Sequence, residues 1–381
     1  MTVTITKPKF NLRDTLNSLK KKTGLFGEQI MRAETATDLY NVIGQNRNIL
    51  INGSMDVWQR GTAWTSGNDN DLYTADRWHF QRYAANSASI SRQSATDNAF
   101  NYCIRVGRVT GDTNTTGYYL NQPVEGLNSK RCLGKWVTFS YWIRTGSAHQ
   151  PGDYFVSSIV YHTDGAYQND GMYYTNFRSA APSSVASDLN LLGKVGTVWK
   201  RFEQTTYIPA GAVQVGVSVQ SAGNGTATSN DYFEVTGLQL EIGNVATPFE
   251  YRSFGAELAL CQRYFESNFP LGTSIAINGT FETYNIGSIA YGSGTTRTPP
   301  IPYKVTKRAY PTITLYSPNG YASSSSNAFN IYISGVWYNW SGGIPNNVNT
   351  NHFNIEGGTP VGVTTGFSYL TAGNWSAVAE L

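Results

Sequence analysis

The residue types that most often bind metals or perform catalysis are sparse in this chain. No two of its four histidines have the HExxH spacing or that of another metal-ligand pair. Its three cysteines form no CxxC unit, and free cysteine usually packs as a small hydrophobe. We predict buried thiols at Cys103, Cys132 and Cys261, no metal site and no cofactor.

Carboxylate chemistry is the next possibility, because glycoside hydrolysis uses two carboxylates about 5 to 9.5 Å apart. Asp153, Asp164 and Asp170 fall in one loop-rich stretch, but their spacing in sequence does not fix that distance. "DGAYQNDG" alternates like a calcium loop, yet it lacks the EF-hand spacing and the distal Glu, so a solvated turn is the preferred interpretation. The chain has no GxSxG, P-loop or GxGxxG motif after a strand. We expect no enzymatic activity.

Sugar binding needs no single motif, because a ring stacks on the apolar face of a pyranose while polar side chains bind its hydroxyls. Two loop-rich segments, 161–178 and 335–353, combine both residue types. The glycan-binding candidates in them are Tyr167, Asp170, Tyr173, Trp337, Tyr338, Trp340, Asn346 and Asn347. In "VWYNW" alternation places Trp337 with Asn339 on one face and Tyr338 with Trp340 on the other. One pair should be buried and the other available, and the sequence leaves open which.

Charge is unevenly distributed along the 381 residues. Residues 1–50 hold eight Lys or Arg against four Asp or Glu, although the net charge of the whole chain is only +3. The remainder is slightly acidic, which argues against nucleic-acid binding. No run approaches the roughly 18 apolar residues that span a bilayer, and the N-terminus lacks the apolar core of a signal peptide. We expect a soluble product, made in a reducing cytoplasm, without membrane insertion.

Residues 1–48 form the one long helical zone, an N-terminal arm. Leu12, Leu16 and Leu19 follow helical spacing, and Lys20 and Lys21 suit the negative end of that helix. Isolated helices of this length are marginal in water, so the arm needs a surface to dock on. That surface is its own domain, another protein or a second copy; the attachment candidates also include Phe26.

The rest of the chain predicts a mainly β protein. With 25 Tyr, 17 Phe, 9 Trp and 38 Gly, the composition is typical of turn-dense β structure. About ten short β runs between 49 and 253 indicate a jelly-roll β-sandwich. In "WVTFSYWIR", Val137, Phe139, Tyr141 and Ile143 alternate onto one face. Residues 254–381 predict a linker helix followed by a second, smaller β-sandwich.

The joint between these parts lies in "LQLEIGNVATPFEYRSFGAELALCQRYFES". Leu238, Leu240 and Ile242 alternate as a closing strand, which the stretch from Gly243 to Pro248 stops because proline lacks the N–H that a ladder uses. Phe249 and Tyr251 are predicted to cover the open end of the core. We expect the helix that follows to bury Leu258, Cys261, Gln262 and Phe265 between the two sandwiches or against another chain.

Three motifs carry a resemblance to a known class of proteins. "NGSMDVWQRG" at 52–61, "YTADRW" at 73–78 and "LEIGNVATPFEYRSFGAELALCQRYF" at 240–265 resemble, in this order, structural proteins of tailed bacteriophages, especially tail fibres and appendages. The chain from about residue 50 to residue 266 also resembles carbohydrate-binding jelly rolls. The resemblance implies a particle-surface location, attachment to other virion proteins through residues 1–48, self-association as a homotrimer and contact with host surface polysaccharide.

The function expected from the sequence is therefore that of a phage virion protein. A tail fibre or receptor-binding appendage would attach by the N-terminal arm and contact host glycans through aromatic and polar loops. A capsid-attached fibre or decoration protein with the same modules need have no receptor role. A polysaccharide-degrading depolymerase is the second alternative.

Overall fold

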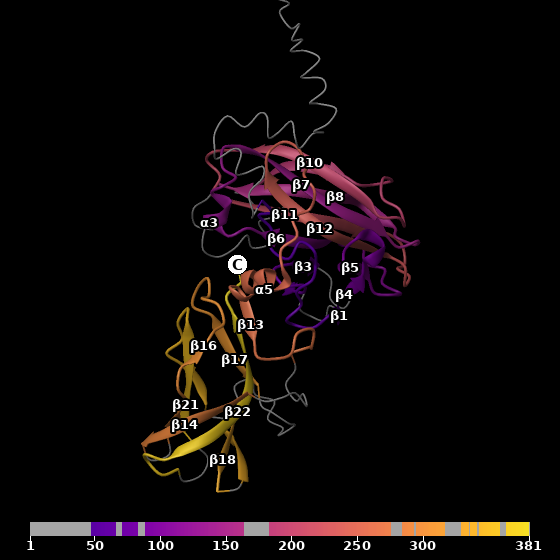
Figure 1. Ribbon diagram of the computed structural model, residues 1–381. Helices are drawn as coiled ribbons and strands as arrows, with labels where there is room; N and C mark the ends of the chain where they lie inside the picture. The colour runs from indigo at the N-terminus through magenta and orange to yellow at the C-terminus, as the bar shows by residue number, and fades with distance from the viewer. Residues whose placement is uncertain are drawn as a thin grey trace, which may run out of the picture.

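The computed structural model describes residues 47–65, 71–82, 88–163, 183–275, 284–292, 295–316, 329–334, 336–340, 343–358 and 363–380. The predicted mainly β fold is confirmed for these residues. The predicted N-terminal helices lie outside them. Figure 1 shows a larger body that contains the strands from β1 to β12, a smaller one formed by the last third of the chain, and helix α5 where they meet.

The larger body, here the first sandwich, consists of two six-stranded antiparallel sheets. The first sheet has the order β1 (Ala63–Thr65), β4 (Ala88–Ser94), β5 (Tyr102–Arg108), β12 (Tyr232–Ile242), β7 (Lys135–Thr145) and β10 (Lys200–Ile208). The second has the order β2 (Asp71–Tyr73), β3 (His79–Arg82), β6 (Tyr118–Pro123), β11 (Gln214–Gly223), β8 (Pro151–His162) and β9 (Ser183–Asn190). Two short helical turns, η1 (Thr96–Asn98) and α3 (Gly126–Ser129), complete it.

The core between these sheets follows from strand alternation. On β7, Val137, Phe139, Tyr141 and Ile143 are fully buried, while Trp136 on the other face is 53% exposed. The alternation predicted for this strand is thereby confirmed. The three cysteines are free and buried, as predicted.

The smaller body, here the C-terminal domain, is one ten-stranded sheet around a second core. Its central strand β22 (Ser368–Val378) pairs with β14 (Tyr284–Gly292) and β18 (Phe329–Ile333) along its first half and with β13 (Phe265–Ser267) and β17 (Thr312–Tyr316) along its second. Its remaining strands are β15 (Thr295–Arg297), β16 (Ile301–Pro302), β19 (Val336–Trp340), β20 (Ile344–Asn346) and β21 (His352–Gly358). Because β22 changes partners along its length, a single sheet encloses the core on two sides.

Helix α5 (Phe254–Gln262) connects the two bodies. Cys261 and Tyr264 pack with Ile51 and Val57 of the first sandwich, and Gln262 is also buried. Phe265, predicted on the helix face, instead begins β13, because α5 ends at Gln262. The helix is thus buried against the first sandwich, and the strand after it enters the C-terminal domain.

The end of the chain returns to this joint, where the letter C lies beside α5 in Figure 1. The Glu380 carboxylate pairs with Arg60 at 2.6 Å and also with Arg77 of the first sandwich. The Arg77 guanidinium lies over the Tyr264 ring at 3.7 Å from its centroid. Ion pairs and ring contacts therefore hold the two bodies together beside α5.

The motif "NGSMDVWQRG" organises the loop against which α5 packs. Asn52 has a left-handed backbone with φ 58°, and its side chain both donates to and accepts from the backbone of Val57, at 2.8 and 2.9 Å. The Asn52 carbonyl accepts from the indole N–H of Trp78, which belongs to the "ADRW" motif, at 3.0 Å. The two motifs are therefore tied together, and their most buried residues serve the fold.

Candidate functional site

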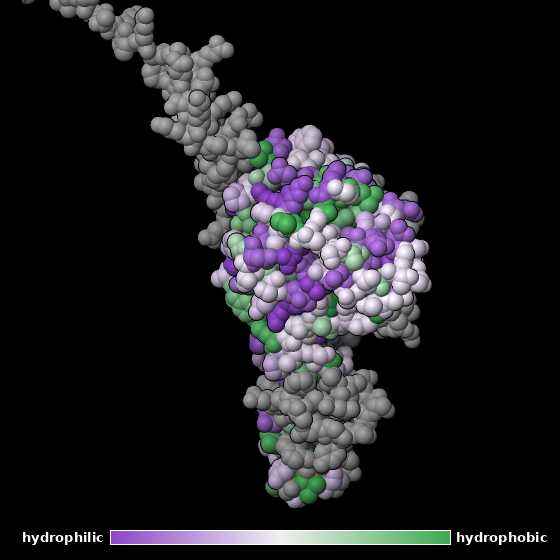
Figure 2. Space-filling view, turned by 90° about the vertical axis from the view of Figure 1, so that its right-hand side faces the viewer, coloured by the Kyte–Doolittle hydropathy of each residue, from purple (hydrophilic) through white to green (hydrophobic). Residues whose placement is uncertain are grey.

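The candidate site lies where two aromatic rings stay exposed near the joint. On the face in Figure 2, hydrophilic residues dominate the larger body and hydrophobic ones form small patches. Large exposed rings are therefore informative, since soluble proteins rarely leave clustered apolar groups on the surface without a use. Tyr251 is 61% exposed and Phe254, three residues later, is 51% exposed.

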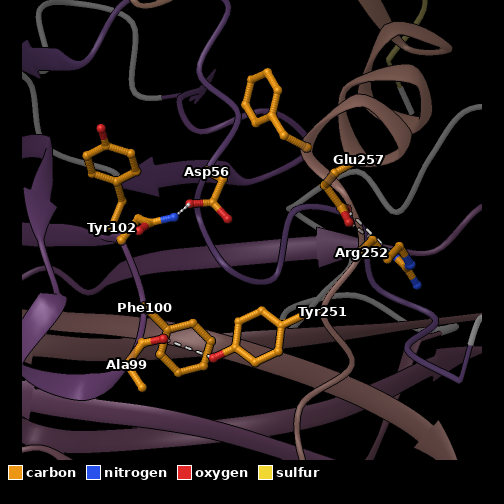
Figure 3. A pocket seen from close by; sticks show the side chains of 9 residues that line it. Asp56, Ala99, Phe100, Tyr102, Tyr251, Arg252 and Glu257 are labelled. Carbon is orange, nitrogen blue, oxygen red and sulfur yellow. Dashed lines mark hydrogen bonds and ion pairs between the residues drawn. The ribbon is translucent and has the colours of Figure 1, made fainter.

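These rings line a pocket of about 250 Å³ (Figure 3). Its other aromatic residues are Phe100 and Tyr102, and its polar residues are Asp56, Asn101, Arg252 and Glu257. In the view of Figure 3 the carboxylates of Asp56 and Glu257 lie on one side, across from the rings of Phe100 and Tyr251. Apolar ring faces opposite hydrogen-bonding groups are the arrangement that a sugar ring requires.

Tyr251 is held in place although most of its surface is exposed. Its hydroxyl donates to the carbonyl of Ala99 at 3.0 Å. Its ring centroid lies 5.6 Å from that of Phe100 and 4.9 Å from that of Phe249. Ala99 has a left-handed φ of 58°, a conformation that costs an L-residue energy and that recurs at functional sites. The Tyr251 ring is thus held in one position before binding. Ligand binding would therefore cost little side-chain entropy at this residue.

The chain reaches this position because the segment after β12 is tied back onto that strand. The Glu241 carboxylate accepts from the backbone N–H of Thr247 at 2.8 Å and from its hydroxyl at 2.6 Å. Two residues after Pro248, Glu250 N–H donates to the side chain of Gln239 at 2.8 Å. β12 ends at Ile242, directly before the stretch from Gly243 to Pro248 that was predicted to stop it. The residue after Glu250, Tyr251, projects at the rim.

Phe254 owes its position to the start of α5. Ser253 caps the helix, its hydroxyl accepting from Ala256 N–H at 3.4 Å, so Phe254 is the first helical residue. Side chains in the first turn of a helix have no preceding turn to pack on. The Phe254 ring is consequently free to line the pocket.

The two carboxylates of the pocket differ in their partners. Glu257 accepts from the backbone N–H of Asn52 and lies 3.4 Å from the Arg252 guanidinium. Asp56 accepts from the Asn101 side chain at 3.5 Å and has no ion-pair partner within the described ranges. Burial, and then the negative charge of Asp56, raises the pKa of Tyr251. The negative charge of Asp56 therefore acts on the Tyr251 side chain.

The outer faces of the two sheets of the first sandwich differ from this pocket. On the outer face of the second sheet the amide side chains of Gln81, Asn121 and Gln220 are at most 3% exposed, so this face is not open. On the outer face of the first sheet, Trp136 and Tyr207 are 53% and 47% exposed, with ring centroids 6.0 Å apart. That pair is accessible, but neither ring belongs to the pocket just described.

The described part of the chain holds no cluster of three His, Cys, Asp or Glu side chains suited to a metal ion. Within the same residues, no helix has both the length and the apolar character needed to cross a bilayer.

The structure describes only some of the residues predicted from sequence as glycan contacts. Tyr167, Asp170 and Tyr173 fall outside the described residues, as do the arm candidates Leu12, Leu16, Leu19, Lys20, Lys21 and Phe26. On β19, Trp337 is the cross-strand partner of Tyr332, which is 39% exposed, and Trp340 that of the buried Phe329. Tyr338 packs against the core of the C-terminal domain. Of these candidates, Tyr338 is the one whose side chain the structure describes, and it does not line the pocket.

Asn346 and Asn347 are engaged within the C-terminal domain. The Asn346 amide donates to Glu356 at 2.6 Å, and the Asn347 amide donates to Asn354 at 3.4 Å. Asn347 has a left-handed φ of 48°. Their amide groups thus already serve the local loop.

Sequence reasoning missed the pocket because its wall joins segments far apart in the chain. Tyr251 and Phe249 were expected to cover the core; Phe249 does contact Phe100, but Tyr251 remains mostly exposed. The available signal was the spacing of Phe249, Tyr251 and Phe254 after a strand-ending proline. That spacing places rings at a sheet edge but does not say which one faces solvent.

Comparisons with known proteins give fold neighbours only. No protein-family model and no curated protein matches the chain. Among solved structures, the enzymatically active domain of tailspike protein 4 of bacteriophage CBA120 is 10% identical with a TM-score of 0.31, covering 52% of this chain and 22% of that chain. A CBM4 structure is 18% identical with a TM-score of 0.30, covering 50% and 98%. A xylan-binding domain from CBM 22 is 12% identical with a TM-score of 0.26, covering 49% and 96%.

These neighbours cover about half of this chain, and the chain spans about a fifth of the tailspike. Overlap at such TM-scores carries no conclusion about activity. The function therefore has to be argued from the site itself.

Proposed function

We propose that this protein is a phage virion component, a tail fibre or receptor-binding appendage, whose first sandwich binds host surface glycans through the pocket at Tyr251 and Phe254. The observation that carries the proposal is the exposed ring of Tyr251, which is fixed by Ala99, Phe100 and Phe249 in a pocket that the Asp56 carboxylate also lines. The phage assignment rests on the resemblance of the three sequence motifs.

Binding without hydrolysis fits the pocket best. A glycosidase needs one carboxyl group that can donate a proton to the leaving oxygen. Glu257 accepts from Asn52 N–H and lies beside Arg252, contacts that occupy its carboxylate and hold its side chain in place. Asp56 alone cannot supply both catalytic roles. We therefore propose a receptor-binding rather than a depolymerising role.

Low affinity at each site is compatible with this role. Aromatic contacts of this kind are worth roughly 0.5–1.5 kcal/mol each beyond area burial. Several copies on one particle facing a repetitive glycan would raise the overall avidity by orders of magnitude. The proposal includes self-association and attachment through residues 1–48, which would supply those copies.

The experiment is adsorption of the purified, fluorescently labelled full chain to host cells, competed with extracted surface polysaccharide. Tyr251→Ala with Phe254→Ala should weaken adsorption, by about tenfold for each ring if each contributes ~1.4 kcal/mol. Tyr207→Ala is the matched control, because this tyrosine is 47% exposed and outside the pocket. Unchanged adsorption of a folded double variant would refute this site. If only Tyr207→Ala loses adsorption, the glycan-binding site lies on the outer face of the first sheet instead.

Particle attachment needs a separate experiment. A chain lacking residues 1–46 should fold and bind glycan but fail to enter virions. Asn48 is kept because its buried side chain accepts from Leu240 N–H at 3.1 Å. Incorporation of the truncated chain at the normal level would refute the anchoring role, and imaging the labelled protein on the capsid instead of the tail would favour a decoration protein.

A further inference from the structure

The pocket has an unbalanced charge. Of its ionised residues, Glu257 is neutralised by Arg252, whose guanidinium also donates to the Leu50 carbonyl at 3.0 Å. Asp56 accepts one 3.5 Å hydrogen bond from Asn101 and no ion pair within the described residues. The pocket therefore retains the negative charge of Asp56.

The rings extend this preference. An aromatic face carries negative electrostatic potential and attracts cations. The Tyr102 ring already contacts a cation, because the Arg92 guanidinium lies 4.3 Å from its centroid. Tyr251 and Phe254 are the rings left more than half exposed to a ligand. A group that is cationic on one side and apolar on another would satisfy both Asp56 and these rings.

We infer that the pocket selects amino sugars, with the protonated amine on the Asp56 carboxylate and the apolar face of the pyranose on Tyr251. The choice of a sugar as the carrier of the amine rests on the proposed function. The choice of the amine rests on Asp56 and the rings. N-acetylation removes the charge and adds bulk, and a neutral hexose lacks the charge, so both should bind more weakly.

The test uses three probes of one linkage: the β-1,4-linked glucosamine trimer, its fully N-acetylated form and cellotriose. Affinities of the full chain are measured by calorimetry at physiological salt and mildly acidic pH, where the amines are protonated. The glucosamine trimer should bind about three- to tenfold more tightly than cellotriose, as expected for a half-exposed charge-assisted contact. Asp56→Asn keeps the size of the side chain and should abolish that ratio, because it should lower the affinity for the glucosamine trimer more than the affinity for cellotriose.

Glu203→Gln is the matched control, because it removes one exposed carboxylate outside the pocket. A ratio that persists in Asp56→Asn, or falls equally in Glu203→Gln, overturns the inference in favour of general charge attraction. If all three trimers bind with equal affinity and that affinity falls when Tyr251 is replaced, the amine selectivity is overturned. Glycan binding in the pocket then stands. Absence of binding by every trimer counts against the inference and against a glycan site in this pocket.

Discussion

Replacing Glu380 with glutamine should loosen the joint between the two bodies. This carboxylate is 5% exposed and pairs with Arg60 and with Arg77, whose side chain is 1% exposed. Glu380→Gln keeps the shape of the side chain and one acceptor oxygen but removes the charge. Arg77 then remains buried with a hydrogen bond to the Pro123 carbonyl at 3.0 Å and the Tyr264 ring, but without its carboxylate.

The expected loss in the free energy of unfolding follows from removing one charge of a buried ion pair while the other charge stays. Breaking such a pair typically costs about 3–5 kcal/mol, because an uncompensated charge remains in a poorly solvated place. The retained contacts of Arg77 place the expected loss at the lower end, ~3 kcal/mol. Arg77→Met combined with Glu380→Gln should cost less than the sum of the two single changes, because no buried charge is then left alone.

The pH dependence has a definite sign. Burial raises the pKa of Glu380, but the charges of Arg77 and Arg60 outweigh it and hold that pKa below its ordinary 4.5. A depressed carboxyl pKa stabilises the folded state above the ordinary value, and this stability is lost as pH falls through the lower folded value. The wild type should therefore lose joint stability in acid, and Glu380→Gln should show less of that loss.

The assay is denaturant unfolding together with hydrogen exchange at Ala379 N–H, which donates to the Tyr264 carbonyl at 2.7 Å across the joint. Glu380→Gln should speed exchange there. The control is Asp97→Asn, which removes the same charge from a pair in which Asp97 is 56% exposed, and it should cost about 0–1 kcal/mol. A loss below ~1 kcal/mol in Glu380→Gln, with unchanged exchange, would refute the assignment of joint stability to this pair.

Three further predictions concern other parts of the chain. Burial raises the pKa of Asp76 from 3.8 to about 6, so its ionisation destabilises the fold as pH rises between those values; Asp76→Asn should flatten that slope in a pH series of unfolding midpoints. Gly237→Ala should weaken glycan binding measured by calorimetry, because φ is +62° and a Cβ would lie 2.5 Å from the Phe100 ring. Gly193→Ala is the control: its φ is +68° and the space around it is open, so this change should lower stability without weakening binding. Phe353→Ala, in the core of the C-terminal domain, should cost about 3–5 kcal/mol and raise hydrogen exchange there while leaving the first sandwich unchanged.

The parts of the fold that follow from local pattern were predictable. Val137, Phe139, Tyr141 and Ile143 alternate on β7 because period-two alternation is itself the geometry of a strand. The end of β12 at Ile242 also falls at the start of the stretch from Gly243 to Pro248 that was predicted to stop the strand. Local rules therefore predicted the sheet class, the burial of the cysteines and the helix after the joint.

The site and the joint depend on contacts that local rules do not reach. The hydrogen bond that fixes Tyr251 spans 152 residues, and the one between Arg77 and Glu380 spans 303. The pairing of Glu380 with the first sandwich has no signature in the last residues of the chain, which read as an ordinary strand end. The candidate pocket could be inferred only after the topology brought those segments together.

The location of a bound saccharide tests the central claim most directly. A crystal structure of the full chain with an oligosaccharide prepared from the host surface should show a pyranose ring against Tyr251 and Phe254, with polar contacts to Asp56 or Asn101. Density for the sugar on Trp136 and Tyr207, or in the C-terminal domain, with the pocket free of it, would contradict the account.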